Sequence, residues 1–163
     1  SRHSMKIERE IGRLLRQTRK TLATAESCTG GLIAHRITNI PGSSDYFERG
    51  YVVYSNRSKS ELLGIEPELI RRHGAVSPEV AGAMAEGARR GSGADYTVGV
   101  TGIAGPTRDA STKPVGLVYI SVSGPEGVRV EEHHFRGTRL QVKRQSAERA
   151  LFFLRDYLID VSK

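Results

Sequence analysis

Short runs of β-branched and apolar residues alternate along this chain with segments of helical periodicity. Ile7, Ile11, Leu14 and Leu15 follow the i, i+4, i+7, i+8 spacing of an amphipathic helix, and a β-tending segment, 21–25, comes next. The alternation continues along the chain until two strands close the sheet as a hairpin, and a last helix follows. It indicates an α/β fold, a three-layer α/β/α sandwich whose mixed, mostly parallel sheet ends in a β-hairpin.

Turn and capping residues divide the chain into its expected elements. Gly64 stops one helix, Ser77 with Pro78 starts another, Gly91 ends it, and Thr138 with Gln141 forms a capping box. We expect strands at 21–25, 46–54, 96–100, 115–122 and 128–135. We expect helices over 7–15, 32–39, 55–63, 78–91 and 138–158.

The 163 residues suit a single domain, 1–163, with residues 1–4 as a terminal arm or a cloning remnant. The chain is 37% hydrophobic and 26% charged, which argues against disorder. No apolar run approaches the ~20 residues of a membrane span, and no signal peptide is evident. Cys28 is the one cysteine, so an intrachain disulfide and a cysteine-built zinc site are excluded. A cytoplasmic setting is the expectation.

The net charge of +7 raises the question of nucleic-acid binding. Residues 1–20 carry +5, residues 129–163 carry +3, and the stretch between them carries −1. The ten aromatic residues are not interleaved with Arg or Lys as in an RNA-binding sheet. We therefore expect neither a nucleic-acid partner nor a membrane partner.

Ser27 lies where a predicted strand ends and a glycine-containing helix begins. The N–H groups of Thr29, Gly30 and Gly31 would be first-turn donors, able with Cys28 to hold an oxyanion or a phosphate. The alternative is an ordinary serine N-cap. Ala25 and Thr29 stand where a G-x-S-x-G nucleophile elbow would have glycines.

A serine nucleophile needs a base, and Lys59 is a better candidate than any histidine. Lys59 falls in the first turn of the helix after Ser55, where the helix dipole and partial burial would disfavour its charged form. A neutral lysine can accept a proton from serine. Tyr54 could hydrogen-bond either group. The histidines, by contrast, suit structural or exposed positions: His35, His73, His133 and His134.

A glycine-rich loop over 102–114 follows an apolar strand, a place where α/β sheets often bind ligands. Its G-x-x-G-P spacing matches neither a dinucleotide fingerprint nor a P-loop. It can equally be a tight connection to the next strand.

Five stretches, in order over about 7–160, together resemble the CinA C-terminal-domain family (competence/damage-inducible CinA proteins). They are 24–31 (TAESCTGG), 41–59, 74–77 (GAVS), 102–106 (GIAGP) and 113–116 (KPVG). The resemblance implies hydrolysis of nicotinamide mononucleotide to nicotinic acid mononucleotide and ammonia in pyridine nucleotide salvage, by a Ser/Lys mechanism that needs no metal or cofactor. It makes Ser27 the nucleophile, Lys59 the base and Tyr54 a helper.

The resemblance also implies a homodimer or larger assembly. Some members carry an N-terminal molybdopterin-binding-like domain with pyrophosphatase activity, for which this chain has no room, so we expect the stand-alone form. In one loop the chain departs from the family. Where members often carry a Gly-Gly pair after Gly-Pro, residues 107–112 read TRDAST.

The substrate phosphate needs hydrogen-bond donors. The candidates for substrate binding, besides the turn after Ser27, are Asn56, Ser77, Thr101, Gly102, Gly105 and Arg144. Two other functions remain open: a catalytically silent module that binds a nucleotide or a partner, and an amidase for another small amide. A lysine nitrogen within hydrogen-bond reach of Ser27 would favour the enzyme.

Overall fold

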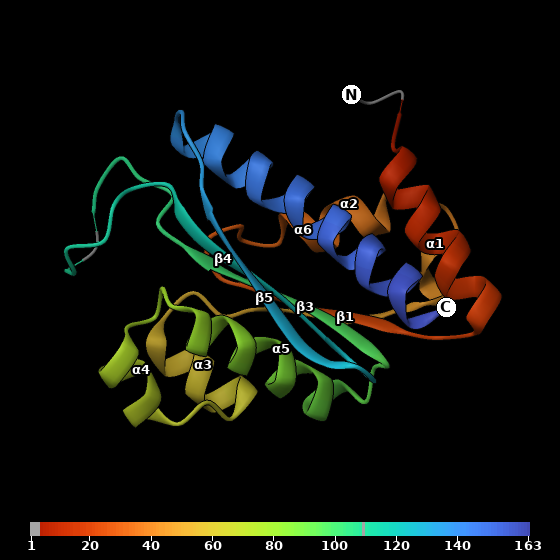
Figure 1. The fold of residues 1–163 in the computed structure, drawn as a ribbon, viewed down its shortest axis with the longest axis horizontal. Coiled ribbons are helices and arrows are strands. Elements are labelled where there is room, and N and C mark those ends of the chain that lie inside the picture. Colours follow the sequence, from red (N-terminus) through yellow and green to blue (C-terminus); the bar gives the residue numbers. More distant parts are fainter. Residues whose placement is uncertain (1–3, 109) are drawn as a thin grey trace.

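A computed structural model describes residues 4–108 and 110–163. Figure 1 shows its elements, which run in this order: α1 (Lys6–Thr18), β1 (Leu22–Glu26), α2 (Leu32–Thr38), a 3-10 turn η1 (Ser43–Asp45), β2 (Phe47–Val52), α3 (Asn56–Leu63), α4 (Pro67–His73), α5 (Pro78–Ser92), β3 (Tyr96–Gly102), β4 (Leu117–Gly124), β5 (Gly127–His134) and α6 (Arg139–Val161). Of the expected terminal arm, residues 1–3 lie outside the described residues, and Ser4 is exposed before α1.

The five strands form one mixed sheet in the order β2-β1-β3-β4-β5. β1 pairs in parallel with β2 and with β3, whereas β4 runs antiparallel to both β3 and β5. Four strands therefore share one direction, and only β4 opposes them. β4 and β5 form the expected hairpin, closed by the pair Gly124 and Gly127.

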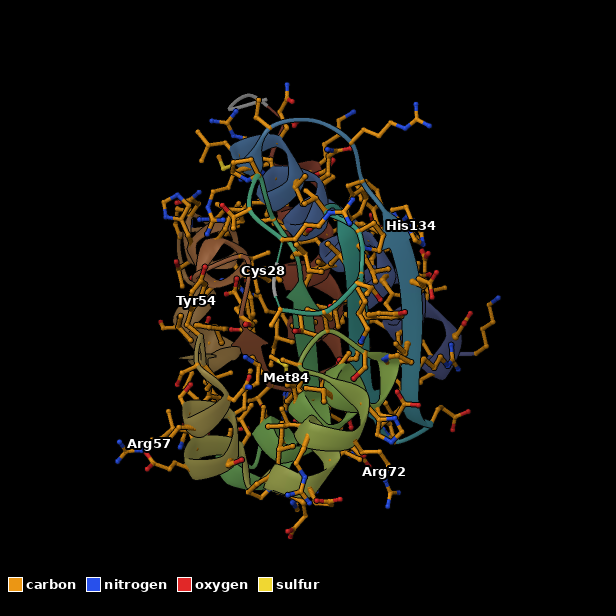
Figure 2. The ribbon with its side chains drawn as sticks, turned by 90° about the vertical axis from the view of Figure 1, so that its left-hand side faces the viewer. Cys28, Tyr54, Arg57, Arg72, Met84 and His134 are labelled. Carbon is orange, nitrogen blue, oxygen red and sulfur yellow. The ribbon has the colours of Figure 1, made fainter. Side chains whose placement is uncertain are left out.

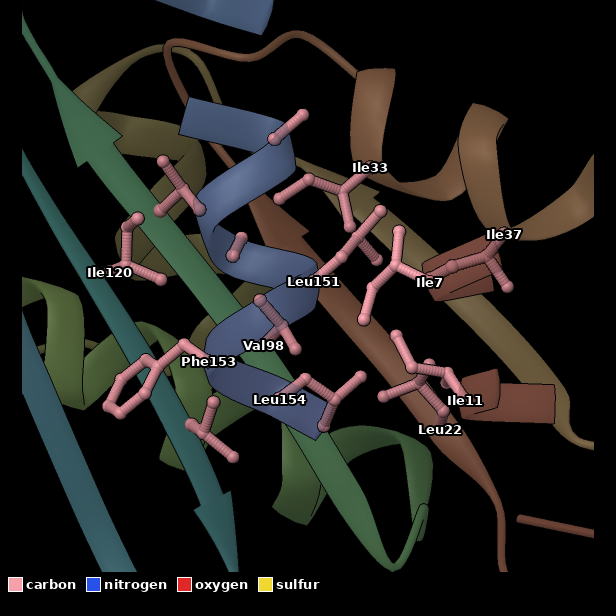
Figure 3. Packing of buried hydrophobic residues seen from close by; sticks show 14 of the residues in the cluster. Ile7, Ile11, Leu22, Ile33, Ile37, Val98, Ile120, Leu151, Phe153 and Leu154 are labelled. Atoms are coloured by element: carbon pink, nitrogen blue, oxygen red, sulfur yellow. The ribbon is translucent and has the colours of Figure 1, made fainter. Parts of the chain in front are cut away.

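Helices cover both faces of the sheet, as expected for a three-layer sandwich (Figure 1). α1, α2 and α6 lie on one face, and α3, α4 and α5 lie on the other. Figure 3 shows the larger core, in which α6 residues such as Leu151 and Leu154 pack against Ile7, Leu22 and Val98 from α1, β1 and β3. β1 and most of β3 are buried on both faces, which fixes the ends of these strands rigidly.

Several expected boundaries are confirmed by local hydrogen bonds. Gly64 ends α3 with a left-handed φ of 67°. Ser77 accepts a hydrogen bond from the Val80 N–H at the start of α5. Thr138 and Gln141 form the reciprocal capping box of α6.

The structure also differs from the expected elements. α4 was missed, although Pro67 at its start and Gly74 after its end are helix-boundary signals. α5 does not end at Gly91 but runs to Ser92, with Gly93 as its left-handed cap. Within the described residues, no helix is long and apolar enough to cross a membrane.

Candidate active site

The carboxyl ends of the three parallel strands meet at one edge of the sheet, and the candidate site lies there. Ser27 follows β1, Tyr54 follows β2, and Thr101 lies near the end of β3. All three residues line a hollow of about 270 Å³. Figure 2 shows Cys28 and Tyr54 beside this edge, with His134 across the sheet from them. Such a position is the usual ligand site of α/β sheets.

Lys59 and Ser27 are in direct contact in this hollow. The Lys59 Nζ lies 3.0 Å from the Ser27 Oγ, although the residues are 32 positions apart in the chain. The same nitrogen donates to the main-chain carbonyls of Val53, at 3.0 Å, and Tyr54, at 3.2 Å. Lys59 is only 1% exposed and Ser27 8%. These contacts fix the lysine nitrogen beside the serine hydroxyl.

Burial shifts the pKa values of Lys59 and Cys28, the two titratable groups next to Ser27. Desolvation lowers the pKa of Lys59 from 10.5 to about 8, because an ammonium ion loses hydration in the interior. Desolvation raises the pKa of Cys28 from 9.0 to about 12, so its thiol stays protonated near neutral pH. The lysine can therefore act as a base, whereas Cys28 is not a thiolate nucleophile.

Glu26 holds the turn that follows Ser27. Its buried carboxylate accepts hydrogen bonds from the Thr29 hydroxyl (2.6 Å), the Ile33 N–H (2.9 Å) and the Ala34 N–H (3.0 Å). The Ile33 and Ala34 N–H groups, which have no partner within α2, thus donate to a side chain from β1. Thr29, Gly30 and Gly31, expected as first-turn donors, precede α2, which begins at Leu32.

The N–H groups that remain near Ser27 belong to the turn before α2. Gly30 donates its N–H to the Ser27 carbonyl at 3.1 Å, so this group is not available to a ligand. The N–H groups of Cys28 and Thr29 make no hydrogen bond to another residue in the part of the chain that the structure describes. Cys28 and Thr29 directly follow Ser27 in the chain.

Arg139, at the start of α6, connects two walls of the hollow. Its guanidinium donates to the Gly105 carbonyl at 2.7 Å and to the Tyr54 hydroxyl at 2.8 Å. The Tyr54 hydroxyl therefore contacts Arg139, and only the Tyr54 carbonyl contacts Lys59. Gly105 has a φ of +80°, and a Cβ there would lie 2.3 Å from a Val115 methyl, so the loop needs glycine at this position.

Eight of the expected site residues line this hollow: Ser27, Cys28, Tyr54, Asn56, Lys59, Thr101, Gly102 and Gly105. Thr101 donates its hydroxyl to the Ala75 carbonyl at 2.8 Å, which ties β3 to the connection before α5. Thr107 and Arg108 also line the hollow, and Asp109 of the same loop lies outside the described residues.

Five other expected residues do not line it. The Ser77 hydroxyl is occupied at the start of α5, accepting from Val80 and donating to the Gly74 carbonyl. The other four line a separate hollow of about 420 Å³ between α2 and α6: Thr29, Gly30, Gly31 and Arg144. For Thr29 and Gly31, contact with a ligand at Ser27 would have to come from the main chain, and the Gly30 N–H is already occupied. Arg144 is exposed on α6 and is not a lining residue of the Ser27 hollow.

The four histidines among the described residues do not line the Ser27 hollow. His35 is exposed on α2, His73 lies near Glu79, and His133 and His134 pair with Glu131 and Glu132 on β5. The described residues contain no group of three His, Cys, Asp or Glu side chains that could hold a metal ion.

Sequence reasoning missed three residues of this region. They are Glu26, Arg108 and Arg139. Arg139 directly follows the Thr138 cap, but nothing local in the sequence connects it with Tyr54 or Gly105. Its position depends on how α6 packs on the sheet.

Comparison with known proteins gives one consistent result. The model of a family described as "CinA C-terminal domain" matches residues 4–158. A CinA-like protein of Geotalea daltonii is 50% identical over 94% of this chain and 37% of its own length. A CinA-like protein of Syntrophobacter fumaroxidans is 47% identical over 96% of this chain and 37% of its own length. The chain thus spans little more than a third of the curated relatives it matches.

Solved structures agree with this result. The crystal structure of competence/damage inducible protein CihA from Agrobacterium tumefaciens has a TM-score of 0.89 at 39% identity and covers 92% of each chain. The competence damage-inducible protein A (ComA) structure from Klebsiella pneumoniae has a TM-score of 0.92 at 28% identity, over 96% of this chain and 97% of that one. The fold and the sequence therefore point to the same group of proteins.

Proposed function

Because this chain belongs to the CinA C-terminal domain family, we propose that it is an amidohydrolase that deamidates nicotinamide mononucleotide to nicotinic acid mononucleotide and ammonia. The observation that carries the proposal is the 3.0 Å contact between the Lys59 Nζ and the Ser27 Oγ inside a hollow. A nucleophile and its base within hydrogen-bond reach form the basic unit of covalent amide hydrolysis. The volume of about 270 Å³ suits a small substrate.

Lys59 takes the role of general base in this proposal. Its pKa of about 8 leaves a usable fraction of neutral amine near neutral pH, and its two carbonyl contacts hold the nitrogen in place. Ser27 Oγ attacks the carboxamide carbon while Lys59 accepts the hydroxyl proton. The oxyanion that forms is stabilised by the N–H groups of Cys28 and Thr29.

The remaining steps return the enzyme to its starting state. Lys59 donates its proton to the amide nitrogen, the C–N bond breaks, and ammonia leaves an acyl-serine. A water molecule then attacks the ester with Lys59 again as base, and the carboxylate product departs. The net reaction consumes one water for each amide hydrolysed.

The substrate phosphate lies toward Arg139 and the loop at Gly102 and Gly105. Arg139 lines the hollow, and its two hydrogen-bond acceptors, the Gly105 carbonyl and the Tyr54 hydroxyl, are uncharged. Its positive charge therefore remains available to an anion. Tyr54 contributes by holding this guanidinium and by accepting the Lys59 hydrogen bond through its carbonyl.

The decisive experiment measures ammonia release from nicotinamide mononucleotide, nicotinamide and nicotinamide adenine dinucleotide. We expect turnover of the mononucleotide, and loss of at least about 10³-fold in kcat in Ser27→Ala and in Lys59→Ala, the scale seen when a catalytic pair is broken. Circular dichroism should show that both variants keep their fold.

Matched controls are Ser60→Ala, one position after Lys59 on α3, and Lys20→Ala, after α1. Neither residue lines the hollow, so both should keep near-native rates. Near-native turnover in Ser27→Ala or Lys59→Ala would overturn the Ser/Lys assignment. Release of ammonia only from another amide would favour a different substrate, and binding without turnover of any amide would favour a silent binding module.

We further propose that the chain acts as a homodimer or a larger homo-oligomer. Support comes from the family resemblance of the sequence. Light scattering of the whole chain should give a mass of at least twice 17.9 kDa, and a monomer mass across the concentration range would contradict the proposal.

A further inference from the structure

The hollow around Ser27 is positively charged. Lys59, Arg108 and Arg139 line it, and none of its described lining residues is acidic. Lys59 is buried beside Ser27, so it belongs to the chemistry. The two arginines lie on segments far apart in the chain, the β3–β4 loop and the start of α6. A ligand of this hollow therefore lies beside two arginines that the reaction itself does not use.

The two arginines differ in what they already contact. Arg139 is anchored by the Gly105 carbonyl and the Tyr54 hydroxyl, both neutral acceptors. Arg108 is exposed and makes no hydrogen bond or ion pair with any residue of 4–108 or 110–163. Gly105, which accepts from Arg139, is only three positions before Arg108 on the same loop. Arg108 thus has its donors available close to the segment that anchors the other guanidinium.

We propose that Arg108 is a substrate-specificity residue that binds the phosphate monoester of the substrate together with Arg139, and so selects nucleotides over nucleosides. The inference rests on the proposed function and adds a residue and a selectivity to it. A guanidinium is suited to this role because its planar set of N–H donors matches phosphate oxygens in a bidentate manner.

The charge of the two substrates makes the selectivity testable. Nicotinamide mononucleotide carries a phosphate that is close to a dianion at pH 7.5 and a cationic pyridinium ring. Nicotinamide riboside has the same ring and amide but lacks the phosphate, so it is a cation. Removing a positive charge from the hollow should therefore weaken binding of the first and leave binding of the second unchanged or slightly stronger.

The experiment compares Arg108→Gln with Arg108→Lys, and with Arg72→Gln as the matched control. Arg72 is an exposed arginine on α4 that does not line the hollow, and Figure 2 shows it far from Cys28 and Tyr54. We expect Arg108→Gln to raise KM for nicotinamide mononucleotide about tenfold, the loss of roughly one charge-assisted contact, with kcat within about twofold. Arg108→Lys should restore part of this loss, and Arg72→Gln should change nothing.

For nicotinamide riboside, kcat/KM of Arg108→Gln should equal or exceed that of the unmodified protein. An equal loss for both substrates, or no loss for the nucleotide, overturns the role of Arg108 and leaves the proposed function intact. If the unmodified protein hydrolyses neither substrate, calorimetry separates the two proposals. A tenfold weaker Kd of Arg108→Gln for the nucleotide alone supports the binding role, and an unchanged Kd overturns it.

Discussion

The Lys59 side chain is buried, and burial disfavours its charged ammonium form. It is 1% exposed, and its hydrogen-bond acceptors are a hydroxyl and two carbonyls. No carboxylate forms an ion pair with it among the described residues. Burial without a counter-charge lowers its pKa to about 8, so a substantial fraction of the amine is neutral at physiological pH.

The rate should therefore depend on pH through Lys59. The base must be neutral, and the neutral fraction grows as pH rises through about 8, so kcat/KM should rise with pH and level off above that value. At pH 7, about a tenth of the molecules would have a neutral lysine. The measurement is kcat/KM for nicotinamide mononucleotide from pH 6.5 to 9.5.

The substrate phosphate has its second pKa at about 6, below this window, so it should not obscure the profile. Far-UV circular dichroism over the same pH range controls for unfolding. A flat profile, or a rise centred near pH 6.5 as for histidine, would contradict Lys59 as the base.

The junction between β1 and α2 shapes the candidate oxyanion site. Glu26, the last residue of β1, occupies the Ile33 and Ala34 N–H groups of α2 and the Thr29 hydroxyl. A carboxylate suits this position because it accepts several hydrogen bonds and lies at the positive end of a helix. Cys28 and Thr29 are therefore held between a rigid strand and a fixed helix start.

Glu26→Gln tests this junction with almost no change in shape. The glutamine amide presents a donor where the carboxylate accepts, so at least one buried N–H or O–H group loses its partner. We expect the free energy of unfolding to fall by about 1–3 kcal/mol and kcat to fall more than KM changes. Urea denaturation and steady-state kinetics at pH 8 measure the two effects.

Glu148→Gln is the matched control because Glu148 is an exposed carboxylate on α6 that pairs with Arg36. Its stability should change by less than about 1 kcal/mol, as for other surface ion pairs. Unchanged kcat in Glu26→Gln would show that the turn keeps its geometry without the carboxylate.

The β3–β4 loop is likewise held by distant elements. Lys113 donates to the carbonyls of His73, at 2.9 Å, and Val76, which connects the loop to the segment before α5. Arg139 of α6 holds the loop at Gly105. Two elements outside the loop thus hold it in place, and Arg108 lies on this loop between Gly105 and Lys113.

For the whole molecule, the net charge of +7 is less informative than where the charges lie. The basic N-terminal and C-terminal regions form much of α1 and α6, and the central region is close to neutral. Within the hollow, however, three cations occur with no acidic residue among the described lining residues. The local field, rather than the overall charge, should therefore govern the binding of an anionic substrate.

The dependence of KM on salt concentration should report this local field. Raising NaCl from about 0.05 to 0.5 M shortens the Debye length to about 4 Å, so KM for nicotinamide mononucleotide should rise several-fold with little change in kcat. KM for cationic nicotinamide riboside should not rise. A salt-independent KM for the nucleotide would show that long-range attraction contributes little.

Local patterns predicted most elements of the fold because they act over short distances. The cap at Ser77, the glycine stop at Gly64 and the Thr138–Gln141 box each depend on neighbours within a few residues. α4 was missed although Pro67 and Gly74 mark its boundaries, because its seven residues contain too little apolar periodicity.

Local propensity and ordered motifs are enough to predict the α/β class, the family and the candidates Ser27 and Lys59. Long-range packing brings the Lys59 Nζ to the Ser27 Oγ, lets Glu26 bind the N–H groups of α2, and places Arg108 and Arg139 around one hollow. These contacts join residues far apart in the chain. They arise when parallel strands align their carboxyl ends and α6 packs across the sheet, which no local pattern specifies.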